Sequence, residues 1–343
     1  MPAVRWSRAK YCKDDVEKMD QRGLQKEEHR TERRNDYDVT NLVNTTDPTA
    51  VDREVSRIFA KLYPETSPRV LNRAFKDLAR LHHGEYPGFR ACDTTYHNLQ
   101  HTLDVTLAMA RLMDGYERSP QRVDALGARL FSLGIVTALF HDVGYLRRES
   151  DMRHKNGAEY TLKHVGRGAR FLEGYLGKLG MAKLAPAAAR IVHFTGYERS
   201  INTIRLPSPI FRMLGNLLGT ADIIAQMSDR CYLEKCRDRL FPEFVEGGLA
   251  ARDETDHRAG VQFKSAEELV VRTPGFYRKA MERLNNQLGG VYHFAETHFK
   301  GRNLYIDTIE RNIQFAIEVA KRRDLSLLRR LPPPPRTANT DPA

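Results

Sequence analysis

The sequence predicts an all-α protein, and three observations lead to this prediction. Apolar residues recur at helical spacing through most of the chain, alternating strand patterns bounded by turns are essentially missing, and prolines stand near the starts of expected helices. Hydrophobic residues make up 41% of the chain, which is enough to bury a substantial core. We therefore expect a single helical domain over residues 47–325, whose C-terminal helices occupy residues 265–325.

The expected helices follow one another along this domain. Apolar residues between Val51 and Leu62 share one helical face, and those between Leu71 and Leu81 share another. Further helices are expected at residues 96–114, 125–147, 157–178, 184–194, 209–243, 275–290 and about 303–323.

The two ends of the chain differ from this domain. Residues 1–40 contain ten Lys or Arg and nine Asp or Glu with few aliphatic side chains, so we expect residues 1–46 to be a flexible, charged extension. A nucleic-acid-binding arm would need a surplus of one sign, which this stretch lacks. Residues 326–343 are rich in proline and polar side chains, and we expect them to be disordered.

Charge and composition exclude several classes of protein. The formal net charge is +11, from 55 basic and 44 acidic residues, and such a field attracts anions such as phosphate groups. The longest apolar run, Leu133 to Phe140, is far shorter than a membrane span, and the first residues lack a hydrophobic signal region. Four cysteines in 343 residues are not a disulfide framework. We expect a cytoplasmic protein with no membrane span, and no motif favours nucleic acid as its partner.

The segment YHNLQHTLDV carries the first group of chemically active side chains. His97, His101 and Asp104 are spaced i, i+4 and i+7, so a helix would place them along one stripe. Two histidines one turn apart can share a divalent ion, or one can bind the ion while the other transfers a proton. The alternative is that these polar residues only cap and stabilise a helix start.

Two further segments place acidic or basic side chains next to apolar helices. The run IVTALF ends in His141 and Asp142, and Asp222 interrupts the apolar helix GNLLGTADIIAQM. Burying such a charge costs several kcal/mol unless it is paired or bound to a metal. The alternatives are that Asp142 caps the following turn and that Asp222 makes a local hydrogen bond.

Together the three segments favour a metal site. A His, a His-Asp doublet and a distant Asp on separate helices can supply two nitrogens and two oxygens to one ion, a set that suits hard or borderline divalent metals. Such a site leaves positions open for water, as catalytic sites do.

With these motifs the chain resembles the HD superfamily of metal-dependent phosphohydrolases. YHNLQHTLDV followed by the His-Asp doublet looks like the catalytic domain of the 3′,5′-cyclic nucleotide phosphodiesterases, and the motif core runs from about residue 93 to 244. The resemblance implies an HD-type helical bundle with the metal site between its helices. It also implies that the ligands of the first metal are His101, His141, Asp142 and Asp222.

The resemblance assigns further roles by position. Asp142 would bridge to a second metal, and His97 would be the general acid that protonates the leaving oxygen. Asp104 would orient an imidazole from outside the ligand shell. His164 or His154 would face the second metal, and we favour His164.

The chain departs from the family's pattern at two places. Related phosphodiesterases have a histidine three residues after the doublet's Asp, where this chain has Tyr145. Their purine-binding Gln and Phe have no clear counterpart; Gln262 with Phe263, or Gln314 with Phe315, match only by residue type.

The expected function is metal-dependent hydrolysis of a phosphate ester, and the leading substrate is a cyclic or linear nucleotide. Two divalent ions (Zn, Mg, Mn or Fe) would polarise the phosphate and activate a bridging water. Alternatives are an HD-type nucleotidase or phosphomonoesterase, a di-iron oxygenase with the same ligands, or a regulatory module that binds a nucleotide without turnover. The C-terminal helices could form a homodimer, and the sequence does not decide this.

Overall fold

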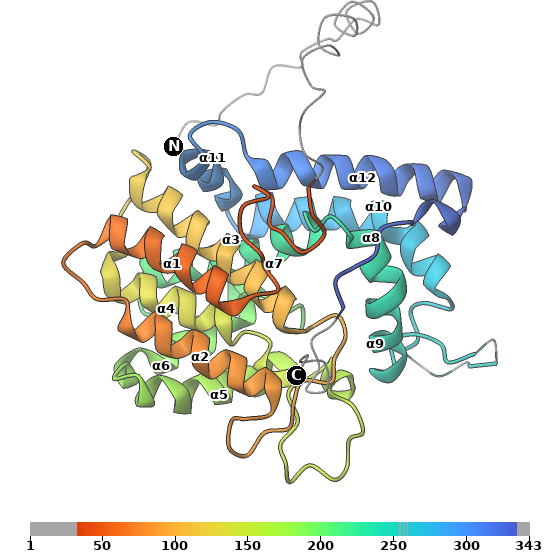
Figure 1. Ribbon diagram of the computed structural model, residues 1–343, viewed down its shortest axis with the longest axis horizontal. Helices are drawn as coiled ribbons and strands as arrows, with labels where there is room; N and C mark the ends of the chain where they lie inside the picture. Colours follow the sequence, from red (N-terminus) through yellow and green to blue (C-terminus); the bar gives the residue numbers. More distant parts are fainter. Residues whose placement is uncertain (1–32, 254, 257, 259, 335–343) are drawn as a thin grey trace, which may run out of the picture. The chain divides into compact units, whose positions relative to one another are not determined.

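The computed structural model describes residues 33–253, 255–256, 258 and 260–334, and it confirms the all-α prediction. Within these residues the only β-type pairings are three isolated bridges, and no strand forms. The longer helices, shown in Figure 1, are α1 (Pro48–Leu62), α2 (Arg69–His83), α3 (Leu99–Arg118), α4 (Gly127–Leu139), α5 (His164–Lys178), α7 (Pro209–Met227), α10 (Ala266–Glu282) and α12 (Leu304–Arg322). The shorter ones are α6 (Ala185–Ile191), α8 (Tyr232–Lys235), α9 (Phe241–Glu246) and α11 (Phe294–Phe299).

Helix α3 is the central element of the core. Every residue from Leu99 to Tyr116 is buried except Asp104, which is partly buried, because α1, α4, α7 and α11 all pack against this helix. Helix α7 comes close to the chain after α6, where a Cβ on Gly219 would lie only 2.5 Å from the carbonyl oxygen of Phe194. The central position of α3 brings its N-terminus next to the ends of α4 and α7.

Several predicted helix boundaries are wrong, and local capping explains the most important one. The segment predicted as 96–114 becomes helical only at Leu99, because Asn98 is the N-cap and its side chain accepts a hydrogen bond from the amide of His101. His97 therefore precedes the helix, and the expected single stripe of His97, His101 and Asp104 does not form. The helix expected over 125–147 ends at Leu139, so the His-Asp doublet lies in the following turn.

The helix expected over 209–243 is divided into two parts. Helix α7 ends at Met227, and the chain resumes as a continuous helical segment over residues 232–246, made of α8, a π-helical turn over Cys236–Leu240, and α9. The helix expected from residue 275 begins earlier, at Ala266, where the Ser265 side chain caps it.

The described parts of both chain ends are held by side chains, although the sequence predicted loose ends. In the expected extension 1–46, the buried carboxylate of Asp38 accepts hydrogen bonds from the amides of Leu42 and Val43 and from the guanidinium of Arg111. In the expected disordered tail 326–343, residues as far as Pro333 accept or donate hydrogen bonds to the 232–246 segment. Residues 1–32 and 335–343 lie outside the described residues. No helix in the described ranges combines the length and the apolar character that a membrane span requires.

Candidate metal centre

His101 reaches the site from the first turn of α3. The helix starts at Leu99 with Asn98 as its cap, and the imidazole of His101 in this first turn faces the carboxylates of Asp142 and Asp222. Its side chain is 9% exposed. Because the ring is so deeply buried, its Nε2 atom must find a partner within the protein.

The His-Asp doublet begins immediately after α4. The side chain of His141 is 1% exposed, and its Nδ1 atom donates a hydrogen bond of 2.7 Å to the carbonyl oxygen of Ala138. This hydrogen bond selects the tautomer that carries the lone pair on Nε2. The Nε2 atom is fully buried and has no hydrogen-bond partner among the described residues. It is therefore ready to bind a cation.

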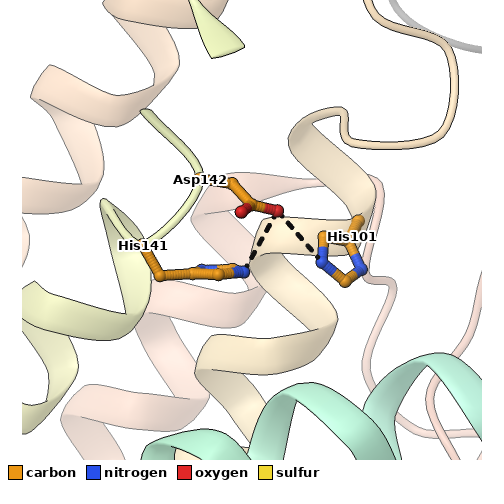
Figure 2. Close-up of side chains that lie close together, drawn as sticks. All are labelled: His101, His141 and Asp142. Carbon is orange, nitrogen blue, oxygen red and sulfur yellow. Dashed lines mark ion pairs between the residues drawn. The ribbon is translucent and has the colours of Figure 1, made fainter. Parts of the chain in front are cut away.

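Asp142 lies between the two histidines. Its Oδ2 atom is 3.3 Å from His101 Nε2 and 3.2 Å from His141 Nε2, as the dashed lines in Figure 2 show. One ligand atom from each of these three side chains lies within 4.8 Å of the others, the spacing that a shared ion requires.

Asp222 completes the cluster from the middle of α7. Its Oδ1 atom is 3.4 Å from His101 Nε2 and 3.9 Å from His141 Nε2. The structure therefore brings His101, His141 and Asp142 within 4.8 Å of one another, and Asp222 lies beside the two imidazoles, outside that group of three.

The electrostatics of the cluster follow from its two carboxylates. Burial lowers the pKa of His101, but hydrogen bonds and charge from Asp142 and Asp222 outweigh burial and raise it to about 10. Burial also lowers the pKa of His141, but the contributions of Asp142 and Asp222 together outweigh it and the pKa is raised. The pKa of Asp142 is held well below its ordinary value, because the positive charge of His141 and the hydrogen bond from His101 outweigh the effect of burial. The cluster thus favours a bound positive charge.

These donors fit a divalent cation. Two imidazole nitrogens and the Asp142 carboxylate lie within 4.8 Å of one another, and the Asp222 carboxylate contacts both imidazoles from α7. Mixed nitrogen and oxygen ligands suit Zn²⁺, Mn²⁺ or Fe²⁺, and no thiolate takes part. The site is therefore a candidate metal centre.

His97 stands beside the cluster in the extended segment before α3. Its Nδ1 atom donates a hydrogen bond of 2.6 Å to Glu243 Oε2, and its ring centroid is 5.7 Å from that of His101. With Nδ1 held by the carboxylate, Nε2 is the nitrogen that remains for a substrate. The side chain is 16% exposed, so it is the more accessible of the two histidines.

Glu243 is the residue that the sequence analysis missed. It lies on α9, its side chain is 4% exposed, and its Oε1 atom accepts hydrogen bonds from the backbone amides of Tyr96 and His97. In the sequence, Glu243 is marked only as an acidic residue between Phe241 and Phe244. Its partner, however, is 146 residues away. Helical periodicity alone does not reveal such a pairing.

The structure separates the two rivals for a second metal. The Nε2 atom of His164, in the first turn of α5, lies 3.5 Å from Asp142 Oδ1. The other carboxylate oxygen of Asp142, Oδ2, is the one that faces His101. His154 instead forms hydrogen bonds with Asp151, 3.1 Å away, and with the hydroxyl of Tyr160. His164 is therefore the one placed to share Asp142.

Asp104 lies one turn beyond His101 in α3. It lines a small polar cavity, together with Gln226, Asp229 and Lys235. Its predicted role in orienting an imidazole stays a prediction.

The arginines near the site are held by the protein itself. The guanidinium of Arg147 pairs with Asp93 at 2.6 Å, and that of Arg167 donates hydrogen bonds to the carbonyl oxygens of Gly144 and Leu146. These contacts favour a structural role over phosphate binding for both.

No protein-family model, curated protein or solved structure matches this chain.

Proposed function

We propose that this protein is a metal-dependent phosphohydrolase of the HD type, acting as a phosphodiesterase on a nucleotide. The observation that carries the proposal is the convergence of His101, His141, Asp142 and Asp222, with His97 beside them. The resemblance of the sequence motifs to the HD superfamily supports the same reading.

The four clustered side chains would hold the first divalent ion. Asp142 and His164 would hold a second, since the two oxygens of Asp142 face different histidines. Bound ions of this kind polarise a phosphate and lower the pKa of a bound water toward neutrality.

The chain's own residues would handle the leaving group. The Glu243 carboxylate fixes the tautomer and orientation of His97, so that His97 Nε2 can carry the proton destined for the departing oxygen. This pairing favours an enzyme over a regulatory binding module, because a module without turnover does not need an oriented proton donor.

Metal analysis and substrate release test this proposal. Purified protein should contain stoichiometric divalent metal, and metal removal should abolish hydrolysis that readdition restores. Release should be assayed for cyclic nucleotides, nucleoside monophosphates and bis(4-nitrophenyl) phosphate. We expect hydrolysis of a diester; hydrolysis of monoesters alone would identify a nucleotidase instead. Metal-replete protein that cleaves none of these esters would contradict a phosphohydrolase.

A further inference from the structure

Tyr145 contacts both histidines that border the candidate metal centre. Its ring stacks on His97 with centroids 4.4 Å apart and planes inclined by 16°, and on His164 with centroids 4.3 Å apart and planes inclined by 19°. The tyrosine is 2% exposed, so both contacts lie inside the protein. This is the position at which the chain departs from the pattern it otherwise resembles.

Within the described residues, the ring of each histidine makes one hydrogen bond, at Nδ1, and His164 Nε2 also lies 3.5 Å from Asp142 Oδ1. His97 is fixed at Nδ1 by Glu243, and His164 is fixed at Nδ1 by a hydrogen bond of 2.6 Å to the carbonyl oxygen of Thr161. These contacts act at the edge of each ring and leave the tilt of the imidazole plane less restricted. A flat ring in contact with the imidazole face limits this tilt.

The backbone holds Tyr145 against His164. A Cβ on Gly144 would lie 1.8 Å from the carbonyl oxygen of His164, so only glycine allows the turn after Asp142 to approach α5 this closely. The Tyr145 hydroxyl also interacts with the side chain of Thr161, the residue whose carbonyl oxygen holds His164. The tyrosine is thus a fixed part of the site.

We propose that Tyr145 is a positioning residue whose ring fixes the imidazole planes of His97 and His164. It would hold His97 toward the leaving oxygen and His164 toward Asp142, so one side chain would orient both the proton donor and the second-metal ligand. The inference rests on the proposed function for its effect on turnover, but its effect on ring geometry does not depend on that function.

Substitution of the ring tests its effect on turnover. Tyr145→Leu should lower kcat by about 10- to 100-fold with KM nearly unchanged, the usual cost of misplacing a catalytic group. The loss should be smaller for a nitrophenyl ester, whose leaving group departs without a proton. Tyr145→Phe keeps the ring and should restore most of the turnover.

Metal affinity provides a readout that does not need a substrate. In Tyr145→Leu the affinity for the second equivalent of Mn²⁺, measured by calorimetry, should fall by about 10- to 100-fold while the first is retained. Tyr175→Leu is the matched control, because Tyr175 is equally buried but stacks on Phe171 and contacts neither histidine. Equal kcat and equal second-metal affinity in the two leucine variants would overturn the proposal.

Proton NMR of the metal-free wild type tests the geometry even if Tyr145→Leu fails to fold. The face of an aromatic ring shields nearby protons, so the imidazole signals of His97 and His164 should lie upfield of that of the partly buried His83, whose ring contacts no aromatic ring among the described residues. Assignment would use His97→Gln, His164→Gln and His83→Gln. Signals that coincide with that of His83 would overturn the proposal. If the wild type hydrolyses no phosphate ester, the proposed function fails, and the metal affinities and ring shifts still decide the role of Tyr145.

Discussion

At the scale of single residues, the candidate centre places four polar side chains where solvent hardly reaches. His141 is the clearest case, because its Nε2 atom is buried, has no well-directed hydrogen bond among the described residues, and lies 3.2 Å from Asp142 Oδ2. A metal coordinated here would satisfy this atom and attract both carboxylates at once.

Loss of either carboxylate should therefore empty the site. We expect Asp142→Ala to abolish activity and most metal binding, because Asp142 is the carboxylate nearest to both His101 and His141 and also faces His164. Asp222→Asn should also remove most of the metal, since an amide is a neutral and weaker ligand. Metal content by mass spectrometry and turnover should be measured on the same preparations. Full metal content in Asp142→Ala would show that this carboxylate is not a ligand. Wild-type turnover in Asp222→Asn would show that α7 contributes no functional side chain to the site.

Substitution of the two histidines near the start of α3 should have different effects on metal content and turnover. His101→Ala should lower metal content and activity together. His97→Ala should keep the metal and slow turnover by about 10²- to 10⁴-fold, the range for a lost general acid, with a smaller deficit for a nitrophenolate leaving group. The measurement is the ratio of wild-type to variant rate for an alkoxide-leaving and an aryl-leaving substrate.

Glu243→Gln provides a second test of the same assignment. It should slow hydrolysis of the alkoxide-leaving and the aryl-leaving substrate as His97→Ala does, but by a smaller factor, because the amide still occupies the space beside His97. Equal rate ratios for the two substrates in His97→Ala would show that His97 positions substrate or water. Metal loss in His97→Ala would mean that the roles of the two histidines are exchanged.

At the scale of elements, the helical segment 232–246 connects the site to the end of the chain. The segment carries Glu243. Two of its arginines also bind residues 325–334: the guanidinium of Arg237 donates a hydrogen bond of 3.3 Å to the carbonyl oxygen of Leu328, and that of Arg239 donates one to the carbonyl oxygen of Pro333. In return, the amide of Arg330 donates to Glu234 at 3.2 Å. In Figure 1 the dark-blue chain after α12 passes α8 along this path.

Removal of this segment should loosen the helix that holds His97. We expect truncation after Asp324 to increase amide hydrogen exchange over residues 232–246 about tenfold, since each lost hydrogen bond contributes about 0.5–1.5 kcal/mol. Turnover should fall with it, because Glu243 lies on the same helix. Exchange is measured by mass spectrometry, and truncation after Pro334 is the control. Unchanged exchange after the longer truncation would contradict this connection.

At the scale of the whole domain, a buried ion pair attaches the chain before α1 to the core. Asp38 and Arg111 are 4% and 2% exposed, and the guanidinium also donates a hydrogen bond of 3.1 Å to the hydroxyl of Tyr305 on α12. Burial alone would raise the pKa of Asp38, but Arg111 and the surrounding hydrogen bonds outweigh it and lower the pKa to about 2. The pair joins the N-terminal segment, α3 and α12.

This pair should make stability depend on pH in a defined direction. A carboxyl group whose pKa is depressed by folding stabilises the protein above its unfolded pKa, near 4, and loses that contribution as the pH falls toward 2; the contribution is about 2–3 kcal/mol. Asp38→Asn should cost about 3–5 kcal/mol at pH 7, because Arg111 stays buried without its partner.

Urea unfolding of metal-free protein at pH 7 and pH 3 tests this dependence. The difference between wild type and Asp38→Asn should be smaller at pH 3. Asp307→Asn breaks the exposed pair with Arg302 and should cost less than about 1 kcal/mol at pH 7. An Asp38→Asn penalty that is the same at both pH values would show that the Asp38 charge does not contribute.

The sequence by itself determined the helical class and the residues that form the cluster. Helical periodicity depends on which face of a segment is buried, so it can be read locally, and the cost of burying His141, Asp142 and Asp222 identified these side chains before any fold was known. The Asn98 cap that separates His97 from the helix agrees with the alternative that polar residues of this segment cap a helix start.

Only the tertiary structure decided which distant groups meet. Glu243 holds His97 across 146 residues, and Tyr145 lies against His97 and His164 because Gly144 allows two backbone segments to approach. Such contacts depend on how helices pack against one another. Periodicity shows that a helix has a buried face, but the neighbour that covers this face is chosen by the packing of the whole core, and so these contacts could not be predicted from the sequence.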